Sequence, residues 1–277
     1  MRILRIATVV LFAATLCLFL WYYREEQAHA DTSYPVLQVA SELLEVSIHD
    51  GGEKLLSGVT AYDAKDGDIT SKVIVESISQ FLDEGVCTVT YAVADADRHV
   101  AKNTRKIRYT DYVPPRFTMN RSLVVTLGTD LNIHSIIGAT DCIDGDISEK
   151  VIIAATDYQT NSAGVFSLSL QAGNSNGDVI YLDMPIYVEE TSPRAPVIEL
   201  SEYLIYVPQG ETPDFSSYIA SVTSSYSNLE ESGVLITGNY RPDVPGVYTV
   251  HYYASDEQGN EGHTALVVVV EEGGAPS

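Results

Sequence analysis

One acidic turn occurs twice in this chain and constrains its architecture more than any other feature. Residues 63–70 read D-A-K-D-G-D-I-T, and residues 141–148 read D-C-I-D-G-D-I-S, 78 positions further on. A glycine between two aspartates, set between apolar runs, is typical of a tight turn. A turn of this composition that returns at a fixed spacing indicates a chain built from copies of one module.

Two other anchors repeat with nearly the same period. One is a proline that opens an alternating run, and the other is a glycine that opens a strand-like run. Their spacings are 79 to 82 residues, and the anchors are Pro35, Pro115, Pro196, Gly85, Gly164 and Gly246. We therefore expect three modules, at residues 34–110, 114–190 and 195–271, followed by a disordered tail at residues 272–277.

The pattern inside each module predicts strands. Short β-branched runs, such as residues 72–76, 150–153 and 265–270, are bounded by turn residues and alternate with a period of two. No stretch after residue 31 has the apolar face of a helix. About seven short strands in a module of this length predict an all-β fold of three tandem immunoglobulin-like antiparallel β-sandwiches. The module prolines suit edge strands, where a missing N–H costs little.

The joints between modules are short and carry prolines. They lie at residues 110–115 and 189–196. Because proline fixes φ and holds a linker extended, the sequence predicts a semi-rigid rod of successive modules.

Residues 1–30 are expected to be a cytoplasmic stub and a transmembrane helix. Residues 6–23 form an uncharged run of 18 residues, which just reaches the length needed to cross the hydrocarbon core. Arg2 and Arg5 precede the run and predict a cytoplasmic N-terminus. Residues 21–23, Trp-Tyr-Tyr, suit an interfacial aromatic belt, which favours a retained single-pass anchor.

Cleavage of this segment is the alternative. Residues 28–30 read A-H-A, a tripeptide that a signal peptidase could cut before Asp31. The protein would then be secreted rather than held in the cell membrane. Both alternatives place the rest of the chain outside the cytoplasm.

The charge balance excludes one class of partner. The chain has 16 basic and 38 acidic residues, a net charge of −22 at pH 7. Such a surface repels nucleic acid, so no nucleic-acid role is expected.

The cysteines do not predict a structural disulfide. Cys17 lies in the apolar run, whereas Cys87 and Cys142 fall in different modules and at different places in the repeat. Both of the latter are expected to be buried thiols.

The ordered set of motifs resembles a known family. Module one has the acidic turn and a strand-like run at residues 85–91, and module three has G-V-Y-T-V-H-Y at residues 246–252 with A-S-D-E-Q-G-N at 254–260. This succession is similar to the bacterial surface-protein immunoglobulin-like domain, a module also found in an insecticidal crystal toxin. The resemblance implies a non-catalytic spacer or adhesion module on a cell surface, and it implies no particular ligand.

Two modules depart from the family pattern. Module three replaces the acidic turn by residues 223–229, T-S-S-Y-S-N-L. Module two replaces the last turn by residues 172–178, A-G-N-S-N-G-D. The loss of the acidic turn marks module three as the divergent copy.

The acidic turns themselves have two interpretations. Their carboxylates could group around Ca²⁺, which takes six to eight oxygens. Alternatively, the aspartates cap nearby backbone N–H groups in a tight turn. The spacing is not that of an EF-hand, so the second interpretation is favoured and no metal-ligating residue is assigned. The six residues are Asp63, Asp66, Asp68, Asp141, Asp144 and Asp146.

The sequence carries no pattern that predicts catalysis. The histidines are scattered singly without an H-E-x-x-H pairing, at His29, His49, His99, His134, His251 and His263. No G-x-S-x-G or S-x-x-K motif stands in a suitable context. We expect no enzyme, no catalytic residue and no cofactor.

Tyrosines gather in module three and support an alternative function. They are Tyr218, Tyr226, Tyr240, Tyr252 and Tyr253. Aromatic rings can stack on sugars and anchor interfaces, although tyrosine is also an ordinary strand residue.

The predicted function is that of a membrane-tethered cell-surface protein whose modules act as a spacer, adhesion or protein-interaction rod. Its partner would be an unknown surface protein or glycan, with the membrane contacted through the N-terminal helix. The alternatives are recognition of a cell-wall or host glycan, and a role as accessory subunit of a surface complex.

Overall fold

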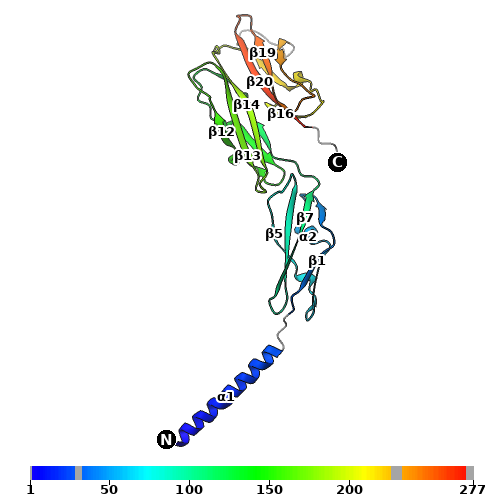
Figure 1. Cartoon of the computed structure of the whole chain (residues 1–277). Helices are drawn as coiled ribbons and strands as arrows, with labels where there is room; N and C mark the ends of the chain where they lie inside the picture. The colour runs from blue at the N-terminus through cyan, green and yellow to red at the C-terminus, as the bar shows by residue number, and fades with distance from the viewer. Residues whose placement is uncertain (1, 29–32, 226–232, 273–277) are drawn as a thin grey trace. The chain divides into compact units, whose positions relative to one another are not determined.

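The computed structural model describes residues 2–28, 33–225 and 233–272. The chain is mostly β and forms two compact units, Met1–Asp111 and Tyr112–Ser277. After an N-terminal helix come three successive pairs of β-sheets, one pair in the first unit and two in the second (Figure 1). The predicted β class and the three tandem sandwiches are confirmed at this level. Residues 29–32, which include the predicted cleavage site, and residues 273–277 of the predicted tail lie outside the described residues.

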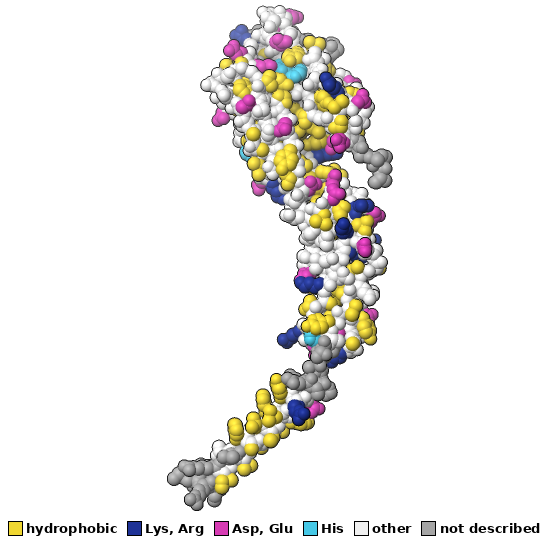
Figure 2. Space-filling model, in the orientation of Figure 1, with side chains coloured by type: hydrophobic (Ala, Val, Ile, Leu, Met, Phe, Trp, Pro, Cys, Tyr) yellow, Lys and Arg dark blue, Asp and Glu magenta, His cyan; other side chains and the backbone are white. Residues whose placement is uncertain are grey.

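The N-terminal helix α1, Arg2–Ala28, covers the whole apolar run. Apolar side chains line much of its drawn surface (Figure 2). Within the residues that the structure describes, however, no helix is both long enough and apolar enough to cross a membrane. The predicted transmembrane helix is corrected accordingly: the run had only just reached the minimum spanning length, and the helix continues beyond it into the polar segment 24–27.

The first module pairs a three-stranded sheet with a four-stranded sheet. The smaller sheet has the order β1–β3–β4, with β1 at Val36–Val39, β3 at Val59–Asp63 and β4 at Gly67–Asp68. The larger has the order β2–β7–β6–β5, with β2 at Leu43–Val46, β7 at Val100–Tyr109, β6 at Val86–Ala94 and β5 at Ile74–Ile78. One helical turn, α2 at Gly52–Leu55, and a 3₁₀ turn, Thr70–Lys72, connect the strands.

The second module repeats this arrangement. Its smaller sheet, β11–β10–β8, contains β8 at Arg116–Met119, β10 at Ile137–Asp141 and β11 at Gly145–Asp146. Its larger sheet, β12–β13–β14–β9, contains β9 at Val124–Thr126, β12 at Ile152–Thr156, β13 at Gly164–Gly173 and β14 at Val179–Glu189. The 3₁₀ turns lie at Ile133–Ser135 and Ser148–Lys150.

The third module keeps the larger sheet, and among the described residues its partner sheet has two strands. The larger sheet, β16–β20–β19–β18, contains β16 at Leu204–Pro208, β18 at Leu235–Gly238, β19 at Gly246–Ser255 and β20 at Glu261–Glu271. The partner pairs β15, Val197–Leu200, with β17, Ile219–Thr223, and a 3₁₀ turn at Phe215–Tyr218 precedes β17.

The strand directions differ from the expected purely antiparallel sandwich. In each four-stranded sheet one pair is parallel: β2 with β7, β9 with β14 and β16 with β20. The second strand of each module crosses to the other sheet and meets the last strand of the module there. A parallel pair requires a long connection, and the rest of the module supplies it. The expected edge position is confirmed for β1 and β8, which follow Pro35 and Pro115.

Strand β20 is buried on both faces. Leu266 and Val268 point into the core of the third module, together with Val250 and Tyr252. Val267, on the opposite face, belongs to the core of the second module. The run A-L-V-V-V-V at residues 265–270 therefore lacks polar alternation because neither face meets water.

The second and third modules consequently share a hydrophobic core. Leu204 of β16 joins Val267 in the second module's cluster, with Tyr206 partly buried beside them. Polar contacts seal the same joint: the N–H of Ala265 donates to Ser122 Oγ at 3.0 Å, and the N–H of Phe117 donates to the Tyr206 hydroxyl at 2.9 Å. These two modules touch directly as well as being joined by their linker, because apolar surface on β16 and β20 is buried only when the modules meet.

Replacing Leu204 by alanine tests this shared core. Because Leu204 is 8% exposed and lies among residues of the other module, Leu204→Ala is expected to destabilise the second unit by about 2–5 kcal/mol through lost burial and a cavity. Differential scanning calorimetry of the full chain measures the change. Leu235→Ala on β18, where the side chain is 61% exposed, is the matched control and should leave the transition within about 0.5 kcal/mol. Equal effects of the two variants would contradict the shared core.

Candidate functional site

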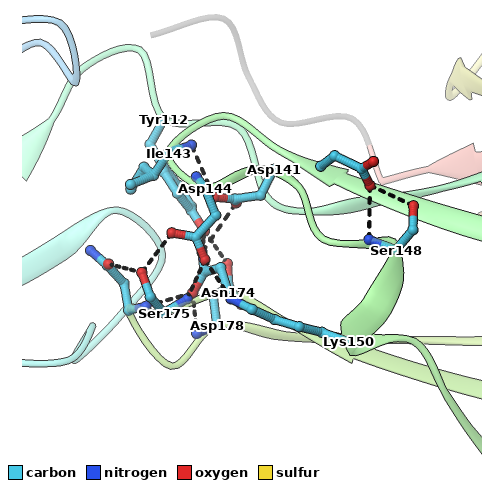
Figure 3. A network of polar contacts seen from close by, with 11 residues as sticks. Tyr112, Asp141, Ile143, Asp144, Ser148, Lys150, Asn174, Ser175 and Asp178 are labelled. Atoms are coloured by element: carbon cyan, nitrogen blue, oxygen red, sulfur yellow. Dashed lines mark hydrogen bonds and ion pairs between the residues drawn. The ribbon is translucent and has the colours of Figure 1, made fainter.

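In the second module the acidic turn is closed by one buried carboxylate. Asp141, 7% exposed, lies at the end of β10. Its Oδ1 accepts hydrogen bonds from the N–H groups of Ile143 and Asp144, at 2.9 and 2.8 Å (Figure 3). The carboxylate thus supplies the hydrogen-bond acceptor that the backbone of a tight turn cannot. This explains the aspartate at the first position of the motif.

The same carboxylate ties this turn to the last turn of the module. Asp141 Oδ2 accepts from Asn174 Nδ2 at 3.2 Å. Asn174 also donates to the hydroxyl of Tyr112, at 3.0 Å, and that hydroxyl donates to Asp178 at 2.6 Å (Figure 3). Burial, followed by the hydrogen bond to Asp178, raises the pKa of Tyr112 well above its ordinary range. The network therefore attaches Tyr112, where the chain enters the module, to both turns.

The remaining acidic side chains of this turn also bind protein groups. Asp144 accepts from Lys150 Nζ at 2.7 Å and from Ser175 Oγ at 2.6 Å, and the Lys150 contact is the main cause that lowers its pKa. Asp146 Oδ1 accepts from the hydroxyl of Ser148 at 2.6 Å, which lowers the pKa of Asp146. Each carboxylate is engaged by a donor from the module itself.

The first module builds the same turn with one difference. Asp63 Oδ1 accepts from the N–H groups of Lys65 and Asp66, both at 2.9 Å. Asp66 Oδ2 in turn accepts from the N–H of Ala96 at 2.7 Å, which joins the two turns. Asp63 Oδ2 is buried and has no hydrogen-bond partner among the described residues, whereas its counterpart on Asp141 accepts from Asn174.

A residue exchange in the last turn explains this difference. Asp95 and Asn174 occupy the same place, since the N–H of each donates across its turn, to His99 O and Asp178 O respectively. An asparagine offers Nδ2 as a donor to the neighbouring carboxylate, and an aspartate offers none. Asp95 Oδ2 instead contacts His99 Nδ1 at 2.8 Å.

The carboxylates of the acidic turns act mainly as hydrogen-bond acceptors for the protein itself. In the described part of the chain, no three or more histidine, cysteine, aspartate or glutamate side chains group so that they could hold a metal. Ca²⁺ takes six to eight oxygens, and the carboxylates of these turns already accept backbone and side-chain hydrogen bonds, although Asp63 Oδ2 accepts none. The arrangement supports the interpretation of the turns as structural.

In the third module the last turn persists without its acidic partner. Asp256 Oδ1 accepts from the N–H groups of Gln258 and Asn260, both at 2.9 Å, so the A-x-D-x-x-G-N motif forms the predicted turn. The linker residue Ser192 contacts Asn260 at 3.1 Å. Residues 226–232, which include Tyr226 and part of the replaced acidic turn, lie outside the described residues.

The tyrosines of the third module that the structure describes pack mainly against the module itself, rather than forming the platform of the sugar-binding alternative. Tyr252 is fully buried and donates to the carbonyl of Phe215 at 2.9 Å. Tyr240 packs edge-on against Phe215 at 5.2 Å, and Tyr253 stacks on His263 at 4.3 Å between ring centroids. Tyr218 is half-buried beside β17. Tertiary packing uses these rings, as is common for tyrosines in strands.

One polar cluster escaped the sequence analysis. His251 and His263, read there as single histidines, lie 2.9 Å apart between Nδ1 and Nε2, and His263 Nδ1 lies 2.9 Å from Glu189 Oε1 of the second module. The signal was available in the hairpin register: Tyr253 pairs with His263 and His251 pairs with Ala265, so the two histidines lie diagonally on one face. The contact with Glu189 depends on module packing and had no sequence signal.

The thiols agree with the expectation only in part. Cys87 is fully buried, and burial raises its pKa to about 11. Cys142 is only half-buried and donates from Sγ to the carbonyl of Val113 at 3.1 Å. No disulfide joins the cysteines in the described part of the chain.

Comparisons with known proteins give limited help. No family model matches the chain, so the resemblance to bacterial surface immunoglobulin-like domains stays a prediction. An uncharacterized 81.3 kDa protein of Acholeplasma phage L2 is 28% identical over 142 residues, which is 50% of this chain and 19% of that protein. The match therefore spans only a small part of the phage protein.

Solved structures with tandem β domains are also similar. Drosophila N-cadherin EC1-3 is 14% identical with a TM-score of 0.32, covering 84% of this chain and 98% of that one. A structure of CBM51-2 in complex with GlcNAc and INT domains from Clostridium perfringens ZmpB is 22% identical with a TM-score of 0.23, covering 53% and 26%. At these TM-scores the similarities carry no argument about function.

The unsatisfied carboxylate predicts an unusual stabilising substitution. Asp95→Asn is expected to stabilise the first unit by about 1 kcal/mol, because the new Nδ2 can donate to the buried Asp63 Oδ2 as Asn174 does to Asp141, and this gain is expected to exceed the loss of the contact between Asp95 Oδ2 and His99. Thermal unfolding of the full chain at neutral pH measures this change. A lower melting temperature for Asp95→Asn would contradict it. EGTA is expected to leave the melting temperature of both proteins unchanged, and a decrease would show that a calcium ion occupies the turns.

Proposed function

We propose that this chain is a non-catalytic spacer or adhesion protein that acts outside the cytoplasm. The fold consists of tandem β-sandwich domains, an architecture that suits a structural or adhesion role. The observation that best supports the proposal is the sealed joint between the second and third modules. A joint of this kind fixes the orientation of one module relative to the next. A spacer or adhesin requires such an orientation, whereas an isolated ligand-binding domain does not.

Polar contacts at the far end of β20 add to this joint. Arg116 of β8 forms an ion pair with Glu271 of β20, in which Nη2 contacts both carboxylate oxygens at 2.7 and 2.8 Å, and the guanidinium lies over the ring of Tyr206 at 4.9 Å. Burial raises the pKa of Tyr206 to about 12, so its hydroxyl stays neutral. The two ionic side chains are partly exposed and are therefore expected to set the orientation of the modules more than their stability.

The surface is consistent with a passive role. On the face drawn in Figure 2, acidic side chains are spread among polar and apolar ones rather than gathered in one patch. The side chains that could serve as acids, bases or nucleophiles in the turn network are held in hydrogen bonds within the modules. We propose accordingly that the chain has no enzymatic activity, needs no cofactor, and binds a surface protein rather than nucleic acid.

Cell fractionation with N-terminal sequencing tests the location. Residues 33–272 are expected to be removed by protease from intact cells, or to be found in the medium with a new N-terminus at Asp31. Protection of these residues until the cells are lysed would overturn an extracytoplasmic role. Co-purification of one stoichiometric protein partner, lost in Leu204→Ala and retained in Leu235→Ala, would show that the joint supports binding.

A hollow on the first module favours glycan recognition as a second candidate. It has a volume of about 470 Å³ and lies on the outer face of the smaller sheet. Tyr62, 61% exposed, lines it together with Gln38, Thr60 and Asp68. An exposed ring flanked by amide, hydroxyl and carboxylate groups is the combination that a neutral sugar can stack on and hydrogen-bond to.

A glycan array probed with the full chain tests this candidate. If sugar binds at this hollow, Tyr62→Ala is expected to reduce the signal at least about tenfold through loss of the stacked ring. Tyr181→Ala is the matched control, because Tyr181 is 70% exposed and lies on β14, outside the hollow. Equal signals for both variants and the parent would exclude this site.

A further inference from the structure

Strand β7 of the first module concentrates positive charge in an acidic chain. It holds four of the 16 basic residues of a protein whose net charge is −22: Lys102, Arg105, Lys106 and Arg108. Successive side chains of a strand point to opposite faces, and the exposure of β7 alternates accordingly. Arg105 is 3% exposed and points inward, whereas the other three cations lie on the outer face of the larger sheet.

Arg105 is the cation of this strand that the fold uses. Its Nε donates to the Tyr91 hydroxyl at 2.8 Å, and its Nη2 donates to the carbonyl of Leu55 at 2.5 Å. These hydrogen bonds compensate for the burial of the guanidinium. Arg105 is therefore a structural residue, and its role does not extend to the outward cations.

The outward cations form only exposed contacts. Lys102 Nζ contacts Glu76, and Arg108 Nη1 lies 3.6 Å from Glu45 Oε1. The two basic side chains are 54% and 53% exposed, and ion pairs at such positions contribute little to stability. Lys106 lies between them on the same face and is also exposed. The stability of the module therefore does not account for these three cations.

The repeat shows that the fold does not require cations at these positions. The residue that pairs with the first residue after the anchor glycine is Arg108 in the first module, Tyr187 in the second and Val269 in the third. By the same register, Lys106 corresponds to Val267. In the third module Val267 and Val269 pack into the apolar cluster of the second. A face that is apolar and covered in the third module is thus charged and exposed in the first.

A fourth cation lies in the turn between β6 and β7, at a cost in backbone strain. Among the described residues, Arg98 is the non-glycine residue with a positive φ, 74°. The N–H of Arg98 donates across its turn as those of Gly177 and Gly259 do in the other modules, where φ is 85° and 79°. A side chain in the left-handed region is strained, and glycine is not. An arginine in the place of glycine therefore points to a use for its charge.

We propose that the outward cations of β7, together with Arg98, form a docking surface for an anionic polysaccharide of a cell surface. This cationic row consists of Arg98, Lys102, Lys106 and Arg108. Charge complementarity indicates the class of ligand, since the row is basic in an otherwise acidic chain. The inference rests on the surface role proposed above for the source of the polymer, whereas the binding itself can be measured on the purified chain.

The spacing of the row favours a sparsely charged polymer. Cations two residues apart on one face of a strand lie about 7 Å apart, and those four residues apart about 14 Å. Such intervals suit an extended sugar chain that carries its anionic groups singly. Duplex nucleic acid carries one charge per about 1.7 Å and would also meet the acidic remainder of the protein, which repels it.

The surroundings of the row fit a sugar chain. On β6, Thr88 and Thr90 lie beside the row and offer hydroxyl groups for hydrogen bonds. Their side chains are short, so they leave the longer basic side chains accessible. The exposed contacts with Glu45 and Glu76 can exchange for anionic groups of the polymer at little cost.

Binding of fluorescent dextran sulfate by the full chain tests the proposal, with uncharged dextran as the matched polymer. Dextran sulfate is expected to bind and dextran is not. A plot of log affinity against log salt should have a slope of about −3, because each of the four cations releases about 0.7 of a counterion. Dextran sulfate that binds no more tightly than dextran at low salt would overturn the proposal.

Lys106→Gln tests the row itself. The variant is expected to bind dextran sulfate about fivefold more weakly, with a salt slope shallower by about 0.7. Lys72→Gln is the matched control, because it removes the same charge from a 51% exposed side chain of the same module, in the turn Thr70–Lys72. The control should lose less than about twofold in affinity. Equal losses for the two variants would show a response to net charge alone and would overturn the row.

Arg98→Gly separates a binding role from a structural one. Binding is expected to weaken while the melting temperature of the first unit does not fall, because glycine adopts the left-handed conformation without strain. Unchanged binding with a lower melting temperature would contradict the role of Arg98.

Two further measurements keep the candidates apart. Tyr62→Ala should leave dextran sulfate binding unchanged, since Tyr62 lies on the other sheet of the module, and a loss equal to that of Lys106→Gln would overturn the row. Duplex DNA that competes more strongly than dextran sulfate would overturn the assignment to a polysaccharide. Neither result bears on the location of the protein, which cell fractionation tests separately.

Discussion

A buried carboxylate that accepts two backbone N–H groups holds each of the first two modules together at one end. Asp63 and Asp141 close the hairpin of the smaller sheet, and the pairings β3–β4 and β10–β11 follow directly from that closure. In the second module the other oxygen of Asp141 reaches Asn174, and through it the linker residue Tyr112. The acidic turn, the last turn and the linker are distant in sequence and therefore meet at the side chain of Asp141. A buried acceptor of this kind is normally paired with a donor.

The turns also show how the repeat has diverged. The first module has Asp95 where the second has Asn174, and Asp63 Oδ2 lacks the donor that Asp141 receives. The third module retains Asp256 in its last turn and has lost the acidic turn motif. What holds the third module in place is instead the apolar contact of β16 and β20 with the second. The third module, which lacks the acidic turn, therefore depends on apolar packing against the second module.

Packing of these two modules creates a polar site that neither module has alone. Glu189 comes from the second module and the two histidines come from the third, and the two tyrosines around them are divided in the same way. The ordinary value of a histidine pKa lies close to physiological pH, so small changes in burial and charge decide its protonation. This end of the joint therefore holds two imidazoles, whereas the contact between Arg116 and Glu271, at the other end of β20, involves a guanidinium that stays charged.

The sequence by itself determined the number of modules, their strands and their turns. These are local properties: the spacing of Pro35, Pro115 and Pro196, the Asp-Gly-Asp turns and the period-two alternation depend only on neighbouring residues. The same local information made the apolar run 6–23 resemble a membrane span, and it made Tyr252 resemble a surface ring. The run 265–270 likewise indicated a strand, although not that both of its faces would be covered.

Only the tertiary structure decided which surfaces meet. The parallel pairing of β2 with β7 arises because a strand changes sheets within its module, and no local pattern records that crossing. The shared core brings Leu204 and Val267 of the third module against residues of the second. The contact of His263 with Glu189 likewise joins residues of different modules, more than 60 positions apart in the sequence. Such contacts depend on the free energy of burying apolar surface between modules, which the sequence of either module alone does not contain.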